Sequence, residues 1–401
     1  MEEIELSVMS YDYSVSDLEA VLQEFEARHH VRVRIVQLSW ETSWTEVMKY
    51  ALHGHGPAVS EIGSTWIATL ATMNALRPFS YAEVSALGGS AAFLPAMWRS
   101  GLLLDDPTIW AIPWLADARV IHYRRHWLKA VGVDESTAFQ TQARLEHTLE
   151  RLQASGVSFP WAVPTQPTLN TVHNITSWVW GAGGNFVDDR RQQVAFAQAE
   201  ARAGIRAYYS LYRFLPLHSH PIGPAQADVL FSEGRAAVTL TGPWLMLTQS
   251  LPPNPELAAD VGAALPPGVP FVSGSHLVVW CSVAPRQERL AVELARFLTS
   301  KQAQSQCSQQ VGLLPVRLDV LDSPPFVDQP LYRVMGQALK AGRSFPAMRL
   351  WGLIEEKLSA VLGDVWANVL TAPNPDLDAL IQAALDPLAE RLNMTLLYNT
   401  R

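Results

Sequence analysis

Strand-like and helix-like segments alternate along the first third of the chain. Apolar residues at every second position over 4–9 and 31–35 predict two strands, and a third strand is expected over 58–62. Apolar residues at helical spacing predict helices over 16–30, 43–53 and 66–74. Because strands and helices alternate in this way, the pattern predicts a parallel sheet covered by helices, with right-handed crossovers.

The middle of the chain has a more helical pattern, and strands return after it. A strand is expected over 119–123, followed by a largely helical region to about residue 234. Later strands are expected over 236–240, 261–265 and 275–281, and then a helix over 287–299. The last seventy residues are expected to be helical, with an apolar stripe formed by Leu377, Leu380, Ile381, Ala384, Leu385, Leu388 and Leu392. The Pro-rich residues 251–255 are expected to form a surface loop.

This order of segments predicts two lobes that the chain crosses more than once. A first lobe is expected from residues 1–114 and 266–320, and a second lobe from residues 115–265 and 321–401. A length of 401 residues also favours two domains over one. Several crossings form a hinge, and a hinge allows two lobes to close on a ligand held in a cleft between them.

Composition narrows the class of protein. Hydrophobic residues make up 48% of the chain and charged residues 17%, which is typical of a globular protein. The net charge is −8 without a long basic run, so nucleic-acid binding has no electrostatic support. No apolar stretch reaches the ~18–20 residues of a transmembrane helix. The acidic opening Met-Glu-Glu-Ile-Glu is unlike a signal peptide. We therefore expect either a cytoplasmic protein or one whose leader is missing from this sequence.

The sequence motifs give little support for a metal site or a bound cofactor. Cys281 and Cys307 have no C-x-x-C spacing, which argues against a disulfide framework or a zinc ribbon. Three histidine pairs could ligate a metal, but none has the glutamate of a zincin motif: His53 and His55, His122 and His126, and His218 and His220. The sequence also lacks a Walker A loop, a G-x-S-x-G elbow and an S-x-x-K motif. No metal and no cofactor is expected.

The fourteen tryptophans carry the clearest functional signal. Several of them follow short apolar runs and stand among small or polar residues: Trp40, Trp66, Trp114, Trp178, Trp180 and Trp244. Because an indole combines a flat apolar face with one N–H donor, such residues suit a site that stacks on the C–H faces of a sugar. The alternative is that many of these indoles fill the core.

Five segments, in the same order along the chain, resemble the bacterial extracellular solute-binding protein family 1, the sugar receptors of ABC importers related to maltose-binding protein. The segments are Gly54-His-Gly-Pro57-Ala-Val-Ser-Glu61, residues 111–132, residues 178–188, residues 231–244 with Thr241-Gly-Pro-Trp244, and residues 274–317. Together they span about residues 5 to 320. One departure is Ala58, which stands where the family usually has an aspartate. A role for that carboxylate is therefore in doubt.

The resemblance implies a two-lobed periplasmic-binding-protein (type II) fold of the α/β class, each lobe a sheet flanked by helices. It implies a receptor that captures a carbohydrate between its lobes by hinge closure. Such a receptor delivers the sugar to the membrane permease of an ABC importer and is not an enzyme. A monomer that is extracellular or periplasmic is expected. Two alternatives remain: a ligand-sensing module of the same fold, and a carbohydrate-active enzyme, which would need two carboxylates across the scissile bond.

Twelve residues are the candidates for sugar contact. The expected stacking platforms are Trp40, Trp66, Trp114, Trp178, Trp244 and Trp351. The expected hydroxyl-binding residues are Glu61, Ser64, Asp117, Ser275, His276 and Arg349. Carboxylates and arginine next to aromatic rings favour a polyol over a lipid. Asp117 could instead cap a turn, and Arg349 could pair with a surface acid.

Overall fold

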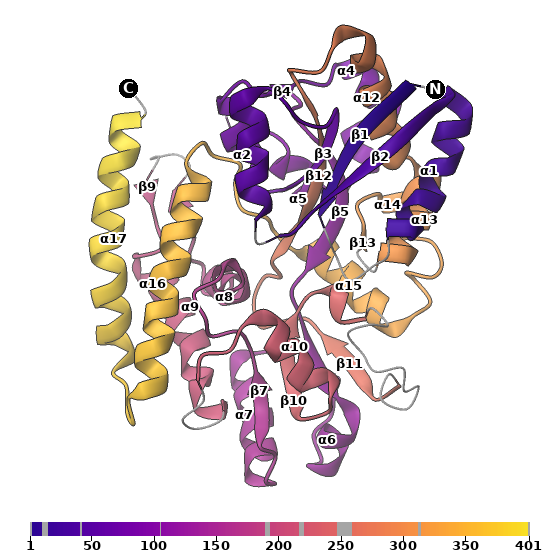
Figure 1. Ribbon diagram of the computed structural model, residues 1–401. Helices are drawn as coiled ribbons and strands as arrows, with labels where there is room; N and C mark the ends of the chain where they lie inside the picture. The colour runs from indigo at the N-terminus through magenta and orange to yellow at the C-terminus, as the bar shows by residue number, and fades with distance from the viewer. Residues whose placement is uncertain are drawn as a thin grey trace. The chain divides into compact units, whose positions relative to one another are not determined.

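The computed structural model describes residues 2–9, 15–40, 42–104, 106–188, 193–215, 220–246, 259–311 and 314–399, and the statements below concern these residues. The chain divides into two compact units (Figure 1). Unit 1 comprises residues 1–117, 272–340 and 344–352, and unit 2 comprises residues 118–271, 341–343 and 353–401. The chain therefore passes from one unit to the other after Asp117, Phe271, Lys340, Arg343 and Gly352.

Unit 1 is built on a mixed sheet in the order β13-β5-β12-β3-β1-β2, with β4 paired to β12. The strands are β1 (Glu2–Met9), β2 (Val31–Leu38), β3 (Val59–Gly63), β4 (Leu76–Arg77), β5 (Ile112–Ala118), β12 (Val272–Trp280) and β13 (Leu314–Pro315). β1 runs parallel to β2 and to β3, as the alternation in the sequence predicts. β12 is antiparallel to β3, and β13 is antiparallel to β5. The carboxyl end of β3 therefore lies beside the start of β12.

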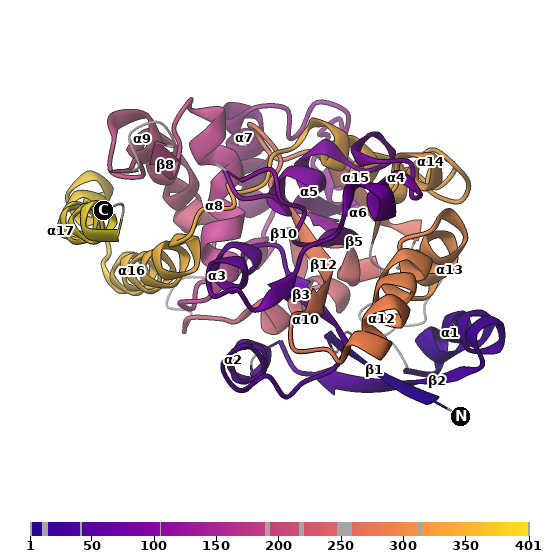
Figure 2. The same ribbon diagram turned by 90° about the horizontal axis from the view of Figure 1, so that it is seen from above.

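Helices cover the sheet of unit 1 (Figure 2). They are α1 (Val15–His29), α2 (Ser43–His53), α3 (Ile67–Thr72), α4 (Tyr81–Ser85), η1 (Ser90–Ala92), α5 (Pro95–Ser100), α12 (Pro285–Leu298), α13 (Lys301–Val311), α14 (Leu318–Leu321) and α15 (Pro330–Ala341). α2 ends at Gly54, whose φ of +65° places it in the left-handed region that favours glycine.

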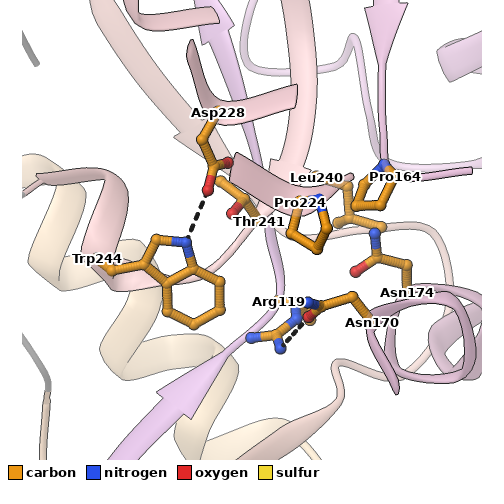
Figure 3. Close-up of a pocket in the computed structure, with 9 residues that line it drawn as sticks. All are labelled: Arg119, Pro164, Asn170, Asn174, Pro224, Asp228, Leu240, Thr241 and Trp244. Carbon is orange, nitrogen blue, oxygen red and sulfur yellow. Dashed lines mark hydrogen bonds between the residues drawn. The ribbon is translucent and has the colours of Figure 1, made fainter. Parts of the chain in front are cut away.

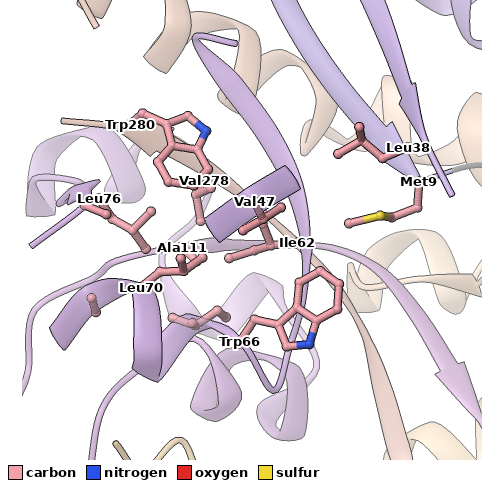
Figure 4. Close-up of a cluster of buried hydrophobic side chains, with 13 residues drawn as sticks. Met9, Leu38, Val47, Ile62, Trp66, Leu70, Leu76, Ala111, Val278 and Trp280 are labelled. Atoms are coloured by element: carbon pink, nitrogen blue, oxygen red, sulfur yellow. The ribbon is translucent and has the colours of Figure 1, made fainter. Parts of the chain in front are cut away.

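A buried apolar cluster lies between β3, β12 and the helices α2 and α3 (Figure 4). Trp280 and Trp66 are its largest members, and the Trp280 indole N–H donates to Ser60 Oγ at 2.8 Å. The cluster comprises Met9, Leu38, Val47, Ile62, Trp66, Ile67, Leu70, Ala71, Ala75, Leu76, Ala111, Val278 and Trp280. Its apolar area is the main source of stability for this part of unit 1, because the hydrophobic effect scales with buried apolar surface.

Unit 2 contains a smaller sheet in the order β11-β6-β10-β7. Its strands are β6 (Val120–Arg124), β7 (Phe159–Ala162), β10 (Ala236–Thr241) and β11 (Val261–Ala264), and β8 (Val187–Asp188) pairs separately with β9 (Gln193–Val194). β10 is parallel to β7 and antiparallel to β6. The sequence pattern missed β7, which falls inside the region predicted to be helical. β7 is short and contains Pro160, which a strand tolerates at a sheet edge.

The helices of unit 2 include a pair near the C-terminal end of the described chain. They are α6 (Arg125–Ala130), α7 (Gln142–Ala154), α8 (Leu169–Gly181), α9 (Ala199–Tyr209), η2 (Ser210–Phe214), α10 (Pro224–Ser232), η3 (Pro243–Met246), α16 (Trp351–Thr371) and α17 (Leu377–Asn399). α17 packs against α9 and lies beside α16 (Figures 1 and 2). The predicted apolar stripe of α17 is the face it buries, with Ile381, Leu385, Leu388 and Leu392 at its centre.

The division of the chain differs from the predicted one in three places. Unit 1 continues to Asp117 rather than ending at residue 114, its second segment begins at Val272 rather than at residue 266, and it keeps residues 321–340 and 344–352. α14 packs on α13 and β13, and a Cβ built on Gly336 of α15 would lie 3.6 Å from Leu321. Helical spacing identifies the buried face of a helix but not the sheet it joins, which is why α15 was predicted in the second lobe. The Pro-rich loop predicted over 251–255 lies outside the described residues.

Within the described part of the chain, no helix has both the length and the apolar content needed to cross a bilayer.

Candidate functional site

A pocket in unit 2 gathers polar side chains around one tryptophan (Figure 3). We call it the Trp244 pocket; its lining residues are Arg119, Pro164, Asn170, Asn174, Pro224, Asp228, Leu240, Thr241 and Trp244. These residues come from the junction of β5 and β6, the segment after β7, the first two turns of α8, the start of α10, the end of β10 and η3. The pocket thus lies at the carboxyl ends of the parallel strands β7 and β10, where α/β sheets commonly bind ligands.

The position of Trp244 depends on the Thr-Gly-Pro-Trp motif. A Cβ on Gly242 would lie only 2.1 Å from the indole ring of Trp244. The ring therefore occupies the space that the side chain of any other residue at position 242 would need. The indole N–H donates to Asp228 Oδ2 at 2.9 Å (Figure 3). The side chain is partly exposed. Trp244 therefore combines a fixed orientation with an accessible ring.

Arg119 lies against this indole. Its guanidinium carbon is 4.5 Å from the ring centroid of Trp244, a cation–π arrangement. A guanidinium nitrogen of Arg119 donates to Asn170 Oδ1 at 2.9 Å. Arg119 itself is 4% exposed. The pocket thus presents an aromatic face next to a planar fork of N–H donors and a carboxylate, the groups that bind sugar hydroxyls.

Unit 1 has a second aromatic group, at the carboxyl ends of β2 and β3. Trp66 meets Trp40 with ring centroids 5.9 Å apart and Trp44 with ring centroids 5.2 Å apart. Both Trp66 and Trp40 lie over Gly63, with ring atoms 3.5 and 3.7 Å from the position of a Cβ. Trp40 is 40% exposed, whereas Trp66 is 9% exposed. Of these rings, Trp40 offers the largest open face.

The structure brings three of the predicted residues together here. Trp40, Ser64 and Trp66 lie at the same end of the sheet, where the Ser64 N–H donates to the Gly274 carbonyl at 3.0 Å. In unit 2, only Trp244 of the predicted residues lines the pocket. Trp178 lies further along α8, is 4% exposed, and donates its indole N–H to Gln142 Oε1 at 2.6 Å.

Most of the other predicted residues are buried within the strands of unit 1. Glu61 is fully buried on β3, where its Oε2 accepts the Met9 N–H at 2.7 Å. Ser275 and His276 are fully buried on β12, and His276 Nε2 lies 2.9 Å from the Met97 carbonyl oxygen. Burial lowers the pKa of His276 to about 4, partly offset by the bond to Met97.

The remaining predicted residues have separate partners. Trp114 is fully buried on β5, and Trp351 is 1% exposed with its ring 4.3 Å from Phe345. Asp117 accepts the Ser273 hydroxyl at 2.8 Å. Arg349 is exposed. The pKa of Asp106 is lowered by hydrogen bonds from Thr108 and Trp110 and, to a smaller extent, by the charge of Arg349.

Several residues of the Trp244 pocket are not among those predicted from the sequence. Arg119 and Thr241 stand in segments that resemble the family, but nothing in their spacing marks them as polar lining. Asn170 and Asn174 are one helical turn apart at the start of α8, and Asp228 follows at the same distance after Pro224 at the start of α10. In α8, the two polar residues spaced by one turn at the helix start are a signal that the sequence contains.

The histidines of one predicted pair, His122 and His126, lie on different elements. His122 lies on β6, whereas His126 is on α6 and bonds to Asp260 at 2.5 Å. His218 lies outside the described residues. Among the residues described, no three His, Cys, Asp or Glu side chains are grouped to hold a metal ion.

Solved structures with a similar fold identify the fold of this chain. An ABC transporter solute-binding protein from Thermotoga lettingae, bound with α-D-tagatose, matches 99% of this chain and 100% of its own with a TM-score of 0.84 and 18% identity. The sugar-binding protein MalE from Xanthomonas citri matches 99% of this chain and 98% of its own with a TM-score of 0.82 and 20% identity. These matches confirm the predicted α/β periplasmic-binding-protein fold.

Sequence comparison gives the family. A maltotriose-binding protein from Pyrococcus abyssi is 23% identical over 195 residues, which are 45% of this chain and 42% of that protein. The aligned part thus spans less than half the length of this relative. The family model described as "Bacterial extracellular solute-binding protein" matches residues 20–334, and the chain therefore belongs to the bacterial extracellular solute-binding protein family.

Proposed function

We propose that this protein is a carbohydrate receptor and that the Trp244 pocket contacts the sugar. The single observation that carries the proposal is the arrangement of an accessible indole beside Arg119, Asp228 and Asn170 in that pocket. An aromatic face binds the apolar C–H side of a pyranose, and the neighbouring donors and acceptors bind its hydroxyls. The similar proteins include a maltotriose-binding protein and the sugar-binding protein MalE, which supports the same ligand class.

Within this proposal, the residues of unit 1 keep a role as further sugar contacts. Trp40 offers an exposed ring supported by Trp66, and Ser64 adds a polar group nearby. Trp114, Trp351 and Glu61 are buried in the present structure and would reach a ligand only after moving.

The proposed role is capture and delivery rather than catalysis. Membership of an extracellular solute-binding family supports a receptor that acts outside the cytoplasm and passes its sugar to the permease of an ABC importer. We propose that this receptor acts as a monomer. The neighbours in fold are binding proteins, among them MalE and a cyclo/maltodextrin-binding protein.

A ligand screen tests this function directly. Thermal unfolding is measured with maltose, maltotriose, maltotetraose and tagatose, because a bound ligand stabilises only the folded state. We expect at least one sugar to raise the Tm, by a shift that grows with its concentration. Chromatography of the same mixtures should recover the sugar uncleaved. If no sugar in a broad panel raises the Tm, the proposal fails, and sugar cleavage would replace it with a hydrolase.

Trp244→Ala is expected to weaken binding of the sugar found in this screen by about 1–4 kcal/mol, the range for a buried aromatic anchor. The loss arises because the stacking face disappears. Calorimetry measures the affinity, and Trp127→Ala is the matched control: a partly buried indole of unit 2 that does not line the pocket. Equal affinities for the wild type and Trp244→Ala would remove Trp244 from the site.

The proposed receptor changes conformation when it binds sugar. Several chain segments connect the two units, and a ligand shifts a conformational equilibrium only if it binds one state more tightly. We expect small-angle X-ray scattering to show a smaller radius of gyration at saturating sugar than without sugar. An unchanged scattering curve at saturation would show that the sugar is bound without closure.

A further inference from the structure

A chain of contacts leads away from the Trp244 pocket to residues that do not line it. Behind Arg119, a guanidinium nitrogen lies 3.4 Å from Nδ1 of His173. On the other side of that imidazole, Nε2 lies 2.9 Å from Glu355 Oε1. Neither His173 nor Glu355 is among the residues that line the pocket.

The chemistry of the groups fixes the direction of these hydrogen bonds. A guanidinium has only donors, so Nδ1 of His173 must accept from Arg119. The proton of the neutral imidazole is then on Nε2, which donates to the carboxylate of Glu355. Glu355 thereby selects the tautomer that can hold Arg119, in the way that outer partners orient a histidine in many sites.

The side chains of His173 and Glu355 are shielded from solvent and held in place by their neighbours. The side chain of Glu355 is 2% exposed and that of His173 is 12% exposed, so solvent competes little for the hydrogen bond between them. The ring of Phe271 covers the imidazole, with centroids 4.6 Å apart. Rotation of His173 away from Arg119 is therefore restricted on more than one side.

The imidazole of His173 contacts three residues that lie close in sequence to points where the chain passes from one unit to the other. Arg119 comes two residues after the passage at Asp117, Phe271 ends the segment before β12, and Glu355 comes three residues after Gly352. His173 on α8 contacts all three of these residues.

We infer that Glu355 and His173 are positioning residues for sugar binding: they hold the Arg119 guanidinium against the indole of Trp244. This inference rests on the proposed function, because it assigns how one part of that same pocket is kept in place. Glu355 and His173 do not touch the sugar; they act through Arg119.

A double-mutant cycle tests the inference. Sugar affinity is measured by calorimetry for the wild type, Glu355→Gln, Arg119→Met and the double variant. Glu355→Gln keeps the shape of the side chain but removes the charge that orients His173, and it should weaken binding about tenfold, within the range for coupled neighbours. In the Arg119→Met background, the same change should have no further effect, because the residue through which it acts is gone.

Controls separate positioning from folding. Glu356→Gln, the adjacent and exposed residue of α16, should bind as the wild type does. Urea unfolding identifies any variant that is not folded, and His173→Gln then replaces Glu355→Gln in the cycle. Additive effects of the two substitutions, or wild-type affinity in Glu355→Gln, would overturn the inference. A wild type that binds no sugar would instead refute the proposed function.

Discussion

Gly204→Ala is expected to destabilise unit 2 by about 3 kcal/mol, at the upper end of the cost of overpacking a core. Gly204 lies where α9 crosses α8, and a Cβ there would be 2.5 Å from the Trp178 carbonyl oxygen and 2.5 Å from Val179 Cα. These are backbone atoms, which cannot rotate away as the end of a side chain can. The two helices must separate instead, and the contacts along both are weakened.

Urea unfolding followed by circular dichroism measures this effect, with each transition analysed separately because the two units need not unfold together. Gly352→Ala is the matched control. It is also a helical glycine, but the nearest atom to its added Cβ is Thr69 Oγ1 at 3.8 Å. There alanine should be neutral or stabilise the helix by up to about 1 kcal/mol. Equal midpoints for Gly204→Ala and the wild type would contradict the close packing of α8 on α9.

Acid is expected to destabilise both units through two buried histidines. Burial lowers the pKa of His122 in unit 2 from 6.5 to about 3, and that of His276 in unit 1 from 6.5 to about 4. Above pH 6.5, each is neutral in the folded and the unfolded chain, so neither adds a pH dependence. Below pH 6.5, the unfolded chain takes up a proton that the folded chain does not, and stability falls until the pH reaches the folded pKa.

The expected slope is about 1.4 kcal/mol per pH unit for each histidine, so lowering the pH from 6.5 to 5 costs about 2 kcal/mol per site. His122→Leu should remove the contribution of unit 2. Neither ring nitrogen of His122 has a hydrogen-bond partner among the described residues, so replacing it by an apolar residue should cost little at pH 7.

Urea midpoints at pH 7, 6 and 5 check this prediction for the wild type and His122→Leu. The exposed His55 provides the control, since His55→Gln should leave the pH dependence unchanged. If His122→Leu loses stability toward pH 5 as steeply as the wild type, the buried imidazole is not the cause of the acid sensitivity.

The regular strands and helices at the start of the chain could be predicted from the sequence. Strands β1, β2 and β3 and helices α1, α2 and α3 lie where the alternating and helical patterns place them, because each buries one regular face. β7 was missed because Phe-Pro-Trp-Ala is too short to show a period. α15 lies largely within the predicted C-terminal helical region, but its unit differs from the predicted one, since that depends on contacts with residues distant in sequence.

Only part of the candidate site could be predicted from the sequence. Trp244 was predicted because Gly242 and Pro243 form a recognisable motif with it. Arg119, Asn170 and Asp228 come from three separate elements, and only the packing of β6, α8 and α10 brings them together. Trp114 and Trp351 remain predicted contacts, but both are buried in this structure. An indole in a favourable sequence context can still be a core residue, and its burial depends on contacts that the local sequence does not contain.

The interleaving of the two units has a consequence for synthesis on the ribosome. β12 lies between β5 and β3 in the sheet of unit 1, yet it follows the four strands of the unit 2 sheet along the chain. While β12 is still being made, β5 has neither β12 nor β13 to pair with. The sheet that begins the chain can therefore be completed only after the strands of the sheet encoded in its middle have been made, unlike an N-terminal domain that is encoded by one continuous segment.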